Sequence, residues 1–268
     1  THAFHDLSPG LDFETKLFVK PDAASLLRIA LGKKGYRASV IALGTNTDPY
    51  QPIEGRWRIT RQILEVLAET SHACTITTKS DRIIRDLDIL APMAAKRLVA
   101  VALSVTSLDP GVHRTLEPRA PQPEKRLKAI RALVDAGIPT HINVAPIIPG
   151  VTDHEIEAIL ARGAESGART ASFIPVRLPH EVAPLFRDWL DTHYPERAER
   201  VMSLIRSIRQ ERANDPDFFS RMRGTGPWAE MIRTRFRIAC KRLGLNRDRV
   251  ELDETLFQPP EGAQLRLF

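Results

Sequence analysis

The sequence predicts an α/β fold, a partial (β/α)6 barrel of the TIM type with parallel strands and extra C-terminal helices. Short apolar runs alternate with longer amphipathic stretches about six times before residue 178. The short runs are apolar at nearly every position, which is typical of parallel strands that are buried on both faces. A length of 268 residues also suits such a barrel as one large domain.

Six segments are predicted to be strands because they are short, apolar and bounded by polar or turn residues. They span residues 10–20, 37–44, 73–79, 97–109, 138–150 and 169–178. The segments between them carry apolar residues at helical spacing and are predicted to be helices. These helices span residues 21–34, 55–70, 81–96, 124–137 and 153–168, with Gly137 closing the fourth and Asp153 capping the fifth.

After the sixth predicted strand the pattern is helical only. Further helices are expected at residues 184–194, 196–212 and 230–245. We therefore expect a barrel at 1–178, a helical extension at 179–247 and a tail at 248–268, because prolines and a glycine near the end favour irregular chain.

The composition excludes several classes of protein. With 43% hydrophobic and 27% charged residues the chain is expected to be globular, and no apolar stretch is long enough to span a membrane. The two cysteines, Cys74 and Cys240, lie far apart in the sequence and do not make a disulfide scaffold. They cannot hold a zinc ion or an iron–sulfur cluster alone, and each is expected to be a small buried residue. A cytoplasmic location without a membrane partner is expected.

The positive charge is concentrated near the C-terminus. From Arg197 to Arg249 there are 14 basic and 6 acidic residues, a net charge of +8, whereas the rest of the chain carries −2 of the total +6. Such a region suits phosphate, nucleic acid or an acidic partner. Solvated helix faces are the alternative, and the absence of interleaved aromatic residues gives no signal for base stacking.

Polar residues follow four successive predicted strands. In a parallel barrel the active site lies at the carboxyl ends of the strands, where the loops converge, so this pattern predicts a polar ligand there. The chain has no glycine-rich phosphate loop, no metal-ligand spacing and no nucleophile elbow. The residues concerned are the run from Thr45 to Pro52, which includes Asn46, Thr47, Asp48 and Tyr50, then Lys79 and Ser80, then Ser104, Thr106 and Asp109 with Glu117 and Arg119 a little further on, then Asn143, Thr152 and Asp153; after the sixth strand come Arg177, His180 and Glu181.

Five segments in order carry a family resemblance: GTNTDPYQPIE, ITTKS, VALSVTSLD, LEPRAPQPEKRLKAIRALVDAGIP and VAPIIPG. They resemble the radical SAM proteins related to spore photoproduct lyase, often described as DNA repair photolyase-like. RLPHEVAPLFRDWL and RMRG resemble a bacterial subgroup, and the resemblance runs from about Leu11 to Leu245. It implies a partial (β/α)6 barrel and a lyase-like enzyme.

The resemblance also implies S-adenosylmethionine (SAM), a [4Fe–4S] cluster held by a CxxxCxxC loop, and an electron donor such as flavodoxin or ferredoxin. The cluster cleaves SAM reductively to start hydrogen abstraction, with nucleic acid as a candidate substrate. No CxxxCxxC is present in these 268 residues. We expect the cluster ligands, with the first strand, upstream of Thr1; a relative that has lost its cluster is the alternative.

The family's cofactor contacts can be carried over residue by residue. The resemblance implies that the run from Thr45 to Asp48 meets the SAM amino group and that Lys79 lies near the SAM carboxylate. It places Ser104 near the ribose or carboxylate. Against the adenine it places Val144, Ala145 and Pro146. The weaker, substrate-side candidates are Tyr50, Arg119, Arg177 and His180.

Two other functions remain open at this point. The first is a non-catalytic barrel that binds SAM or nucleic acid without a cluster. The second is a cluster-free enzyme that uses Lys79 or Asp48 as an acid or base, which would require burial to lower the pKa of Lys79.

Overall fold

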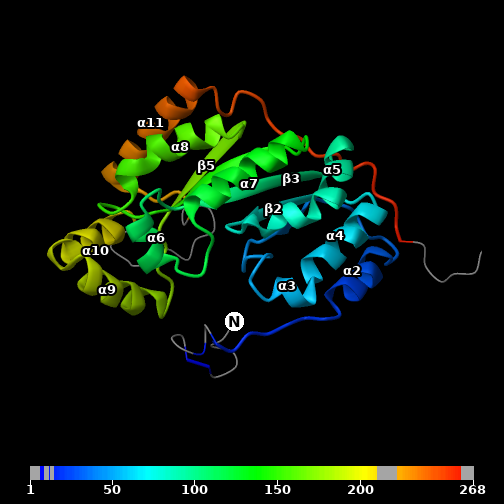
Figure 1. Ribbon diagram of the computed structural model, residues 1–268, viewed down its shortest axis with the longest axis horizontal. Helices are drawn as coiled ribbons and strands as arrows, with labels where there is room; N and C mark the ends of the chain where they lie inside the picture. Colours follow the sequence, from blue (N-terminus) through cyan, green and yellow to red (C-terminus); the bar gives the residue numbers. More distant parts are fainter. Residues whose placement is uncertain (1–6, 9–11, 13–14, 210–221, 261–268) are drawn as a thin grey trace, which may run out of the picture.

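A computed structural model of the chain describes residues 7–8, 12, 15–209 and 222–260 (Figure 1). Five parallel strands form one sheet in the order β1-β2-β3-β4-β5. They are β1 (Ile41–Leu43), β2 (Cys74–Thr78), β3 (Val99–Val105), β4 (Thr140–Ile147) and β5 (Thr170–Pro175). Sequential parallel order with a helix after each strand is the arrangement of a partial TIM-type barrel, as predicted.

The two faces of the sheet differ in chemistry. On one face, large apolar side chains such as Ile76, Leu103 and Ile142 are fully buried in the main core. On the other face, the register aligns Ala102 with His141 and Ser104 with Asn143. Three of these four residues are polar, and Ala102 is small. Because side chains alternate along a strand, the apolar face packs on helices and the polar face lines the inside of the barrel.

Helices cover the apolar face as the periodicity predicted. In α4, for example, Leu64 and Leu67 lie against the core, whereas Gln62, Glu65 and Glu69 are exposed on the opposite side. The elements are α2 (Ala23–Leu31), α3 (Glu54–Trp57), α4 (Ile59–Glu69), η2 (Asp81–Asp86), α5 (Leu87–Ala95), α6 (Pro110–Leu116), α7 (Pro123–Asp135), η3 (Asp153–Glu155) and α8 (Ile156–Glu165).

The strand predicted at residues 10–20 is absent from the part of that segment that the structure describes. Residues 16–20 are irregular, and the rest of the segment lies largely outside the described residues. Leu17 and Phe18 are 47% and 53% exposed, so these two apolar side chains are not buried in a core. Lys16 instead pairs with Asp12 at 3.0 Å, an i,i+4 contact of helical type.

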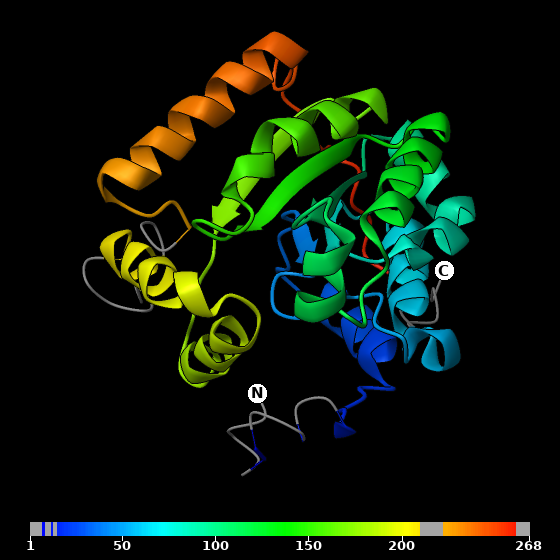
Figure 2. The ribbon, with the colours of Figure 1, turned by 60° about the vertical axis from the view of Figure 1, so that its left-hand side comes forward.

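The helical extension contains α9 (Val182–His193), the 3-10 helix η4 (Pro195–Arg197), α10 (Ala198–Ser207) and α11 (Gly226–Leu243). Helices α9 and α10 form a small second core with Ile148 and Val176, which follow β4 and β5 (Figure 2). Helix α11 lies along α8, where Arg235 forms a two-pronged ion pair with Glu157 at 2.7 and 2.9 Å. None of the described helices is both long and apolar enough to cross a membrane.

The segment 246–258, which we call the C-terminal strap, crosses the amino ends of the strands. Its backbone N–H groups at Asn246, Asp253 and Gln258 donate to Arg169, Arg97 and Thr70 at 2.8–2.9 Å. These acceptors lie just before β5, β3 and β2, respectively. The predicted tail is therefore partly built into the barrel, at the end opposite the predicted site.

Candidate cofactor site at the carboxyl edge of the sheet

The loop after β1 is held to β2 by one carboxylate. Oδ1 of Asp48 accepts hydrogen bonds from the Thr78 hydroxyl at 2.7 Å and the Tyr50 amide at 2.8 Å, and Oδ2 accepts from the Lys79 amide at 2.7 Å. Gly44 begins the loop at φ +89°, and a Cβ there would lie 2.0 Å from a Thr77 carbonyl oxygen, so only glycine fits. The Asp48 carboxylate is thus committed to the loop.

The rest of the loop divides into a buried part and an open part. Tyr50 is 1% exposed, and its hydroxyl donates to the buried Asp86 carboxylate at 3.0 Å. Burial, more than the nearby Asp86 charge, raises the pKa of this phenol. The neighbouring residues Thr45, Asn46 and Thr47 are exposed at the carboxyl edge and are free to meet a ligand.

Glu117 joins three elements at this edge. Its Oε1 accepts a hydrogen bond from the ammonium of Lys79, the residue after β2. The same oxygen accepts from the hydroxyl of Thr106, the residue after β3, at 2.7 Å. Its Oε2 accepts from the Arg126 guanidinium of α7 at 2.6 Å. Burial alone would raise the pKa of Glu117, but the charges of Lys79 and Arg126 outweigh it and lower the value to about 2.

The resulting cluster carries one excess positive charge, because two cations share one carboxylate. The Arg126 side chain is fully buried, whereas the Lys79 side chain remains 33% exposed. An ammonium has three N–H donors, so Lys79 can contact Glu117 and still donate to a ligand. A partly exposed cation backed by a buried ion pair is suited to bind a carboxylate.

The remaining predicted cofactor contacts lie on β3 and β4. Ser104 is 5% exposed and its Oγ lies 3.2 Å from Nδ2 of Asn143 on the inner face. Ala145 is 7% exposed, and Pro146 is half-buried. Val144 points the other way, into the main core, so its side chain is not available to an adenine ring.

A cavity of about 650 Å³ is lined by part of the predicted site. Four predicted residues line it, namely Asp48, Tyr50, Lys79 and Arg119, together with the cations Arg82 and Lys125. The other predicted residues do not line it, namely Thr45, Asn46, Thr47, Ser104, Val144, Ala145, Pro146, Arg177 and His180. The Arg177 guanidinium lies 3.1 Å from the Met222 sulfur, and His180 is exposed just before α9.

Sequence reasoning counted Glu117 and Asn143 among the polar residues near the strand ends but gave them no role, and it missed Arg126. Helical periodicity could have revealed Arg126, because it shares the apolar face of α7 with Ala129, Ile130 and Leu133. An arginine on a buried face needs an acid partner, and Glu117 is the nearest acid before it that is not turned to solvent.

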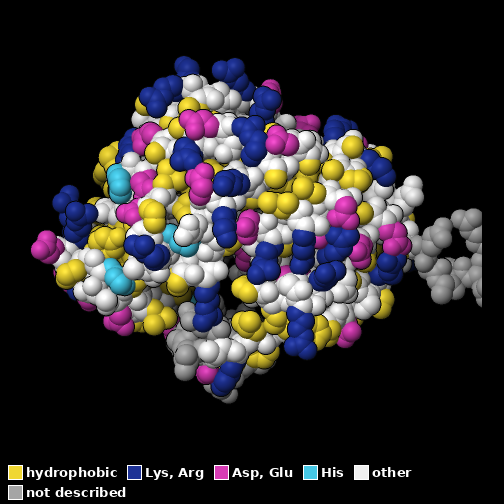
Figure 3. Space-filling model, viewed as in Figure 1, with side chains coloured by type: hydrophobic (Ala, Val, Ile, Leu, Met, Phe, Trp, Pro, Cys, Tyr) yellow, Lys and Arg dark blue, Asp and Glu magenta, His cyan; other side chains and the backbone are white. Residues whose placement is uncertain are grey.

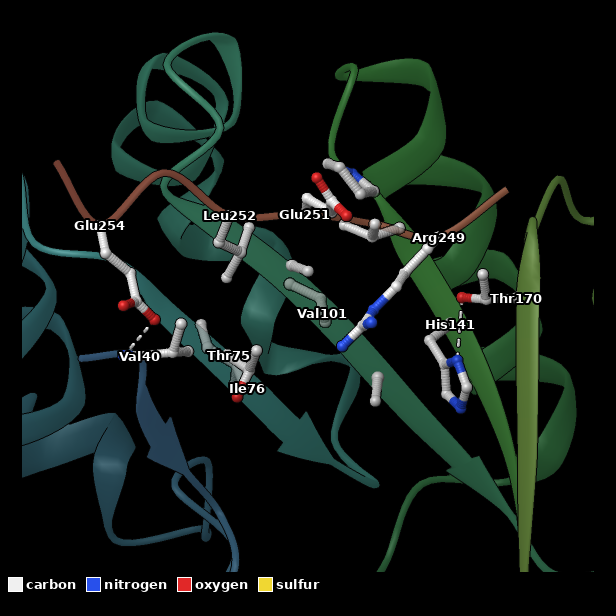
Figure 4. Close-up of a pocket in the computed structure, with 14 residues that line it drawn as sticks. Val40, Thr75, Ile76, Val101, His141, Thr170, Arg249, Glu251, Leu252 and Glu254 are labelled. Atoms are coloured by element: carbon white, nitrogen blue, oxygen red, sulfur yellow. Dashed lines mark hydrogen bonds between the residues drawn. The ribbon is translucent and has the colours of Figure 1, made fainter. Parts of the chain in front are cut away.

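A second cavity, of about 570 Å³, lies at the opposite end of the sheet under the C-terminal strap (Figure 4). His141 and Thr170 line it, and Arg249 of the strap extends into it. Burial lowers the pKa of His141 to about 4, so the imidazole is neutral near pH 7. No predicted site residue lies in this cavity.

The two cysteines do not fit as ligands of an iron–sulfur cluster. Burial raises the pKa of Cys74 to about 12 and that of Cys240 to about 11, whereas a ligand must be a thiolate. Within the described part of the chain no group of three His, Cys, Asp or Glu side chains could hold a metal ion. The described residues therefore fit the carboxylate of SAM, through Lys79 and its ion pair with Glu117. They do not fit a [4Fe–4S] cluster.

The profile of the radical SAM superfamily matches residues 15–162, which is more than half of the chain. The protein therefore belongs to the radical SAM superfamily.

Relatives share most of this chain but extend beyond it. An uncharacterized protein of Mycobacterium bovis is 36% identical over 208 residues, which are 77% of this chain and 61% of the relative. A protein of Methanocaldococcus jannaschii is 29% identical over 161 residues, which are 60% of this chain and 59% of the relative. The chain thus spans about three fifths of the length of these two proteins.

Solved structures of spore photoproduct lyase share the fold. The complex with dinucleoside spore photoproduct has a TM-score of 0.57 at 14% identity and covers 85% of this chain and 66% of that chain. A variant with bound AdoMet and dinucleoside spore photoproduct has a TM-score of 0.51 at 16% identity, over 69% and 55% of the two chains. The predicted fold class is thereby confirmed.

Proposed function

We propose that the whole protein is a radical SAM enzyme that binds SAM at the carboxyl edge of this sheet. The observation that carries the proposal is the buried Lys79–Glu117–Arg126 cluster. It presents one excess positive charge at the partly exposed Lys79, where a carboxylate would bind. Membership of the superfamily makes SAM the ligand to test first.

The residues at this edge have separate roles in the proposal. Lys79 holds the SAM carboxylate, and the exposed loop from Thr45 to Thr47 holds the amino group. Asp48 acts through the loop, because its carboxylate is already occupied by three hydrogen bonds. Ala145 and Pro146 pack against the adenine, and Ser104 contacts the sugar or carboxylate.

The [4Fe–4S] cluster requires ligands from outside the described residues. We propose that they are three cysteines upstream of Thr1, with flavodoxin or ferredoxin as the electron donor. When bound, the cluster supplies the electron that cleaves SAM to methionine and a 5′-deoxyadenosyl radical. This chain contributes the orientation of SAM and the exclusion of water from it.

The test is 5′-deoxyadenosine formation by the whole protein, incubated anaerobically with SAM and dithionite. The wild type should form it, and Lys79→Met should lower the rate at subsaturating SAM by about tenfold or more. Lys96→Met is the matched control, because Lys96 is exposed at the amino end of β3. Product from wild type and equal rates for both variants would contradict the role of Lys79.

A SAM-binding barrel without a cluster is the second candidate. One observation favours it: the part of the chain that the structure describes offers no cluster ligands. The same preparations distinguish the two. SAM binding without iron, and without 5′-deoxyadenosine under reducing conditions, would support the binding protein and overturn the enzyme.

A nucleic-acid substrate is the finer part of the proposal. Helix α11 exposes Arg237, Lys241 and Arg242, and Figure 3 shows basic side chains along this helix and over α3. The spore photoproduct lyase structures contain a dinucleoside photoproduct. Among the described residues Arg237 and Lys241 have no ion-pair partner, so a phosphate backbone could neutralise them.

Salt-dependent DNA binding tests this part. The whole protein should bind a short DNA duplex with a steep salt dependence, and Arg237→Ala with Lys241→Ala should reduce the logarithmic slope by about 0.9 per lost phosphate contact. Lys33→Ala with Lys34→Ala, at the far end of α2, is the charge-matched control. DNA affinity that does not depend on salt, or an equal change of slope for the two double variants, would exclude α11 as the DNA-binding surface.

A further inference from the structure

A row of polar side chains crosses the inner face of the sheet from β5 to β3. Thr170 Oγ1 and Ser172 Oγ lie 2.9 and 2.6 Å from Nδ1 and Nε2 of His141. Ser172 Oγ lies 3.1 Å from Asn143 Oδ1, and Asn143 Nδ2 lies 3.2 Å from Ser104 Oγ. The row begins at the cavity of Figure 4, where the contact of His141 with Thr170 is drawn, and ends at Ser104.

The amide of Asn143 determines the direction of all but the last hydrogen bond in this row. Its Nδ2 can only donate, so Ser104 Oγ accepts, and its Oδ1 can only accept, so the Ser172 hydroxyl donates. Ser172 has then used its one proton and must accept from Nε2 of His141. Burial lowers the pKa of His141 to about 4, so the imidazole is neutral near pH 7 and its Nδ1, without a proton, accepts from Thr170. The directions from Ser104 to Nε2 of His141 follow from the amide of Asn143, and the neutral state of His141 sets the last one, at Thr170.

The Ser104 hydroxyl is left with an unused proton. Its oxygen accepts from Asn143, and among the described residues no acceptor lies within hydrogen-bonding distance of that hydroxyl. The residue is 5% exposed, so few water molecules reach it. A buried hydroxyl without an acceptor is unfavourable, and an acceptor oxygen of a ligand would remove that cost.

We propose that Asn143, held by Ser172 and His141, is a positioning residue that makes Ser104 a hydrogen-bond donor to an acceptor oxygen of the bound ligand. The inference rests on the proposed function in taking SAM as that ligand. The SAM ammonium has no lone pair to accept with, so Ser104 meets a ribose oxygen or the carboxylate. The polarity of the row thereby excludes the SAM ammonium from the position next to the Ser104 hydroxyl.

Asn143→Asp tests the inference, because aspartate has the same shape but accepts on both oxygens. The Ser104 hydroxyl would then donate to Asp and present only lone pairs to the ligand. We expect the dissociation constant for SAM, measured by equilibrium dialysis on the whole protein, to rise about tenfold or more. Gln258→Glu, on the exposed strap, is the control for one added negative charge.

A double-mutant cycle with Ser104→Ala separates hydrogen-bond polarity from charge and from general damage. If Asn143 acts through Ser104, Asn143→Asp should have little further effect in the Ser104→Ala background. An equal loss in both backgrounds, or no loss in either, would overturn the inference. If Asn143→Asp fails to fold, Ser172→Ala in the same two backgrounds gives the same test with a smaller expected loss.

The two acceptors are distinguished with 5′-methylthioadenosine, which keeps the ribose but lacks the amino acid part. A persisting loss of affinity on Asn143→Asp identifies the ribose, and its disappearance identifies the carboxylate. A wild-type protein that does not bind SAM would overturn this inference and the proposed function together. Wild-type binding that Lys79→Met weakens and Asn143→Asp does not would overturn this inference alone.

Discussion

The two ends of the sheet are stabilised by different physical means. At the carboxyl edge, Glu117 is 10% exposed and Arg126 is fully buried. At the amino end the C-terminal strap is held by backbone hydrogen bonds, by apolar contacts of Leu252 and Phe257, and by an ion pair whose Arg97 is 67% exposed. Buried charges lose hydration and add little net stability, whereas apolar and backbone contacts are a direct source of it.

This difference indicates which end carries function. Both ends have a cavity, of about 650 Å³ at the carboxyl edge and about 570 Å³ under the strap, so volume does not separate them. Charge does, since the carboxyl edge holds a buried ion cluster that would be an expensive way to stabilise a fold. We therefore interpret the carboxyl edge as the binding site and the strap as a structural closure.

The largest expected effect is that of Glu117→Ala on stability. It leaves the fully buried Arg126 without its carboxylate, and breaking such a buried pair costs about 3–5 kcal/mol. Urea unfolding would measure the loss, with Glu117→Gln as the variant that keeps the shape but replaces the charge and one accepting oxygen by an NH2 group. A loss below about 1 kcal/mol would mean that the cluster is not the buried unit described here.

The same cluster predicts a dependence of stability on acid. The pKa of Glu117 falls from about 4.5 in the unfolded chain to about 2 in the folded one. Its contribution is therefore fully present above about pH 4.5 and is lost as the pH falls toward 2. The difference in unfolding free energy between the wild type and Glu117→Gln should shrink over that range. A constant difference would contradict the lowered pKa.

At the amino end we expect a smaller effect from Phe257→Ala. The ring lies 5.3 Å from Tyr36 and 5.2 Å from His72 between centroids and is half-buried, so its removal should cost about 1–3 kcal/mol. SAM affinity should not change. A loss of SAM affinity with stability intact would show that the strap belongs to the site.

The smallest expected effect is that of Arg97→Ala. Its pair with Asp253, at 2.9 Å, is exposed on the arginine side, and such pairs contribute about 0–1 kcal/mol. The same unfolding measurement compares it directly with Glu117→Ala. Equal losses at the two positions would remove the distinction between the ends of the sheet.

Much of the fold could be predicted from the sequence, because five of the six apolar runs did become strands. The exception is the segment 10–20, whose residues 16–20 are irregular and whose apolar residues Leu17 and Phe18 are exposed. Proline and glycine near the end of the chain suggested a free tail. In the structure the predicted tail is part of the C-terminal strap as far as Gln258. The hydrogen bonds that hold it there are made with residues far away in the sequence, which local composition does not reveal.

The candidate site could be predicted only in part. Lys79 and Ser104 were found because polar residues follow the strands, but the roles of Lys79, Ser104 and the other site residues stay predictions. Glu117 was noted as a polar residue but its role was missed, because its partner Lys79 is 38 residues away in sequence. Strict alternation along β4 could have placed Asn143 and Ala145 on the inner face and Val144 in the core.

The central claim is that the Lys79 cluster binds the SAM carboxylate. The most direct test is the dissociation constant for SAM of the whole protein, measured by equilibrium dialysis for the wild type, Lys79→Met and Lys96→Met. We predict binding by the wild type and Lys96→Met, and an affinity about tenfold or more lower for Lys79→Met. Equal affinities of all three proteins, or no SAM binding by the wild type, would contradict the claim.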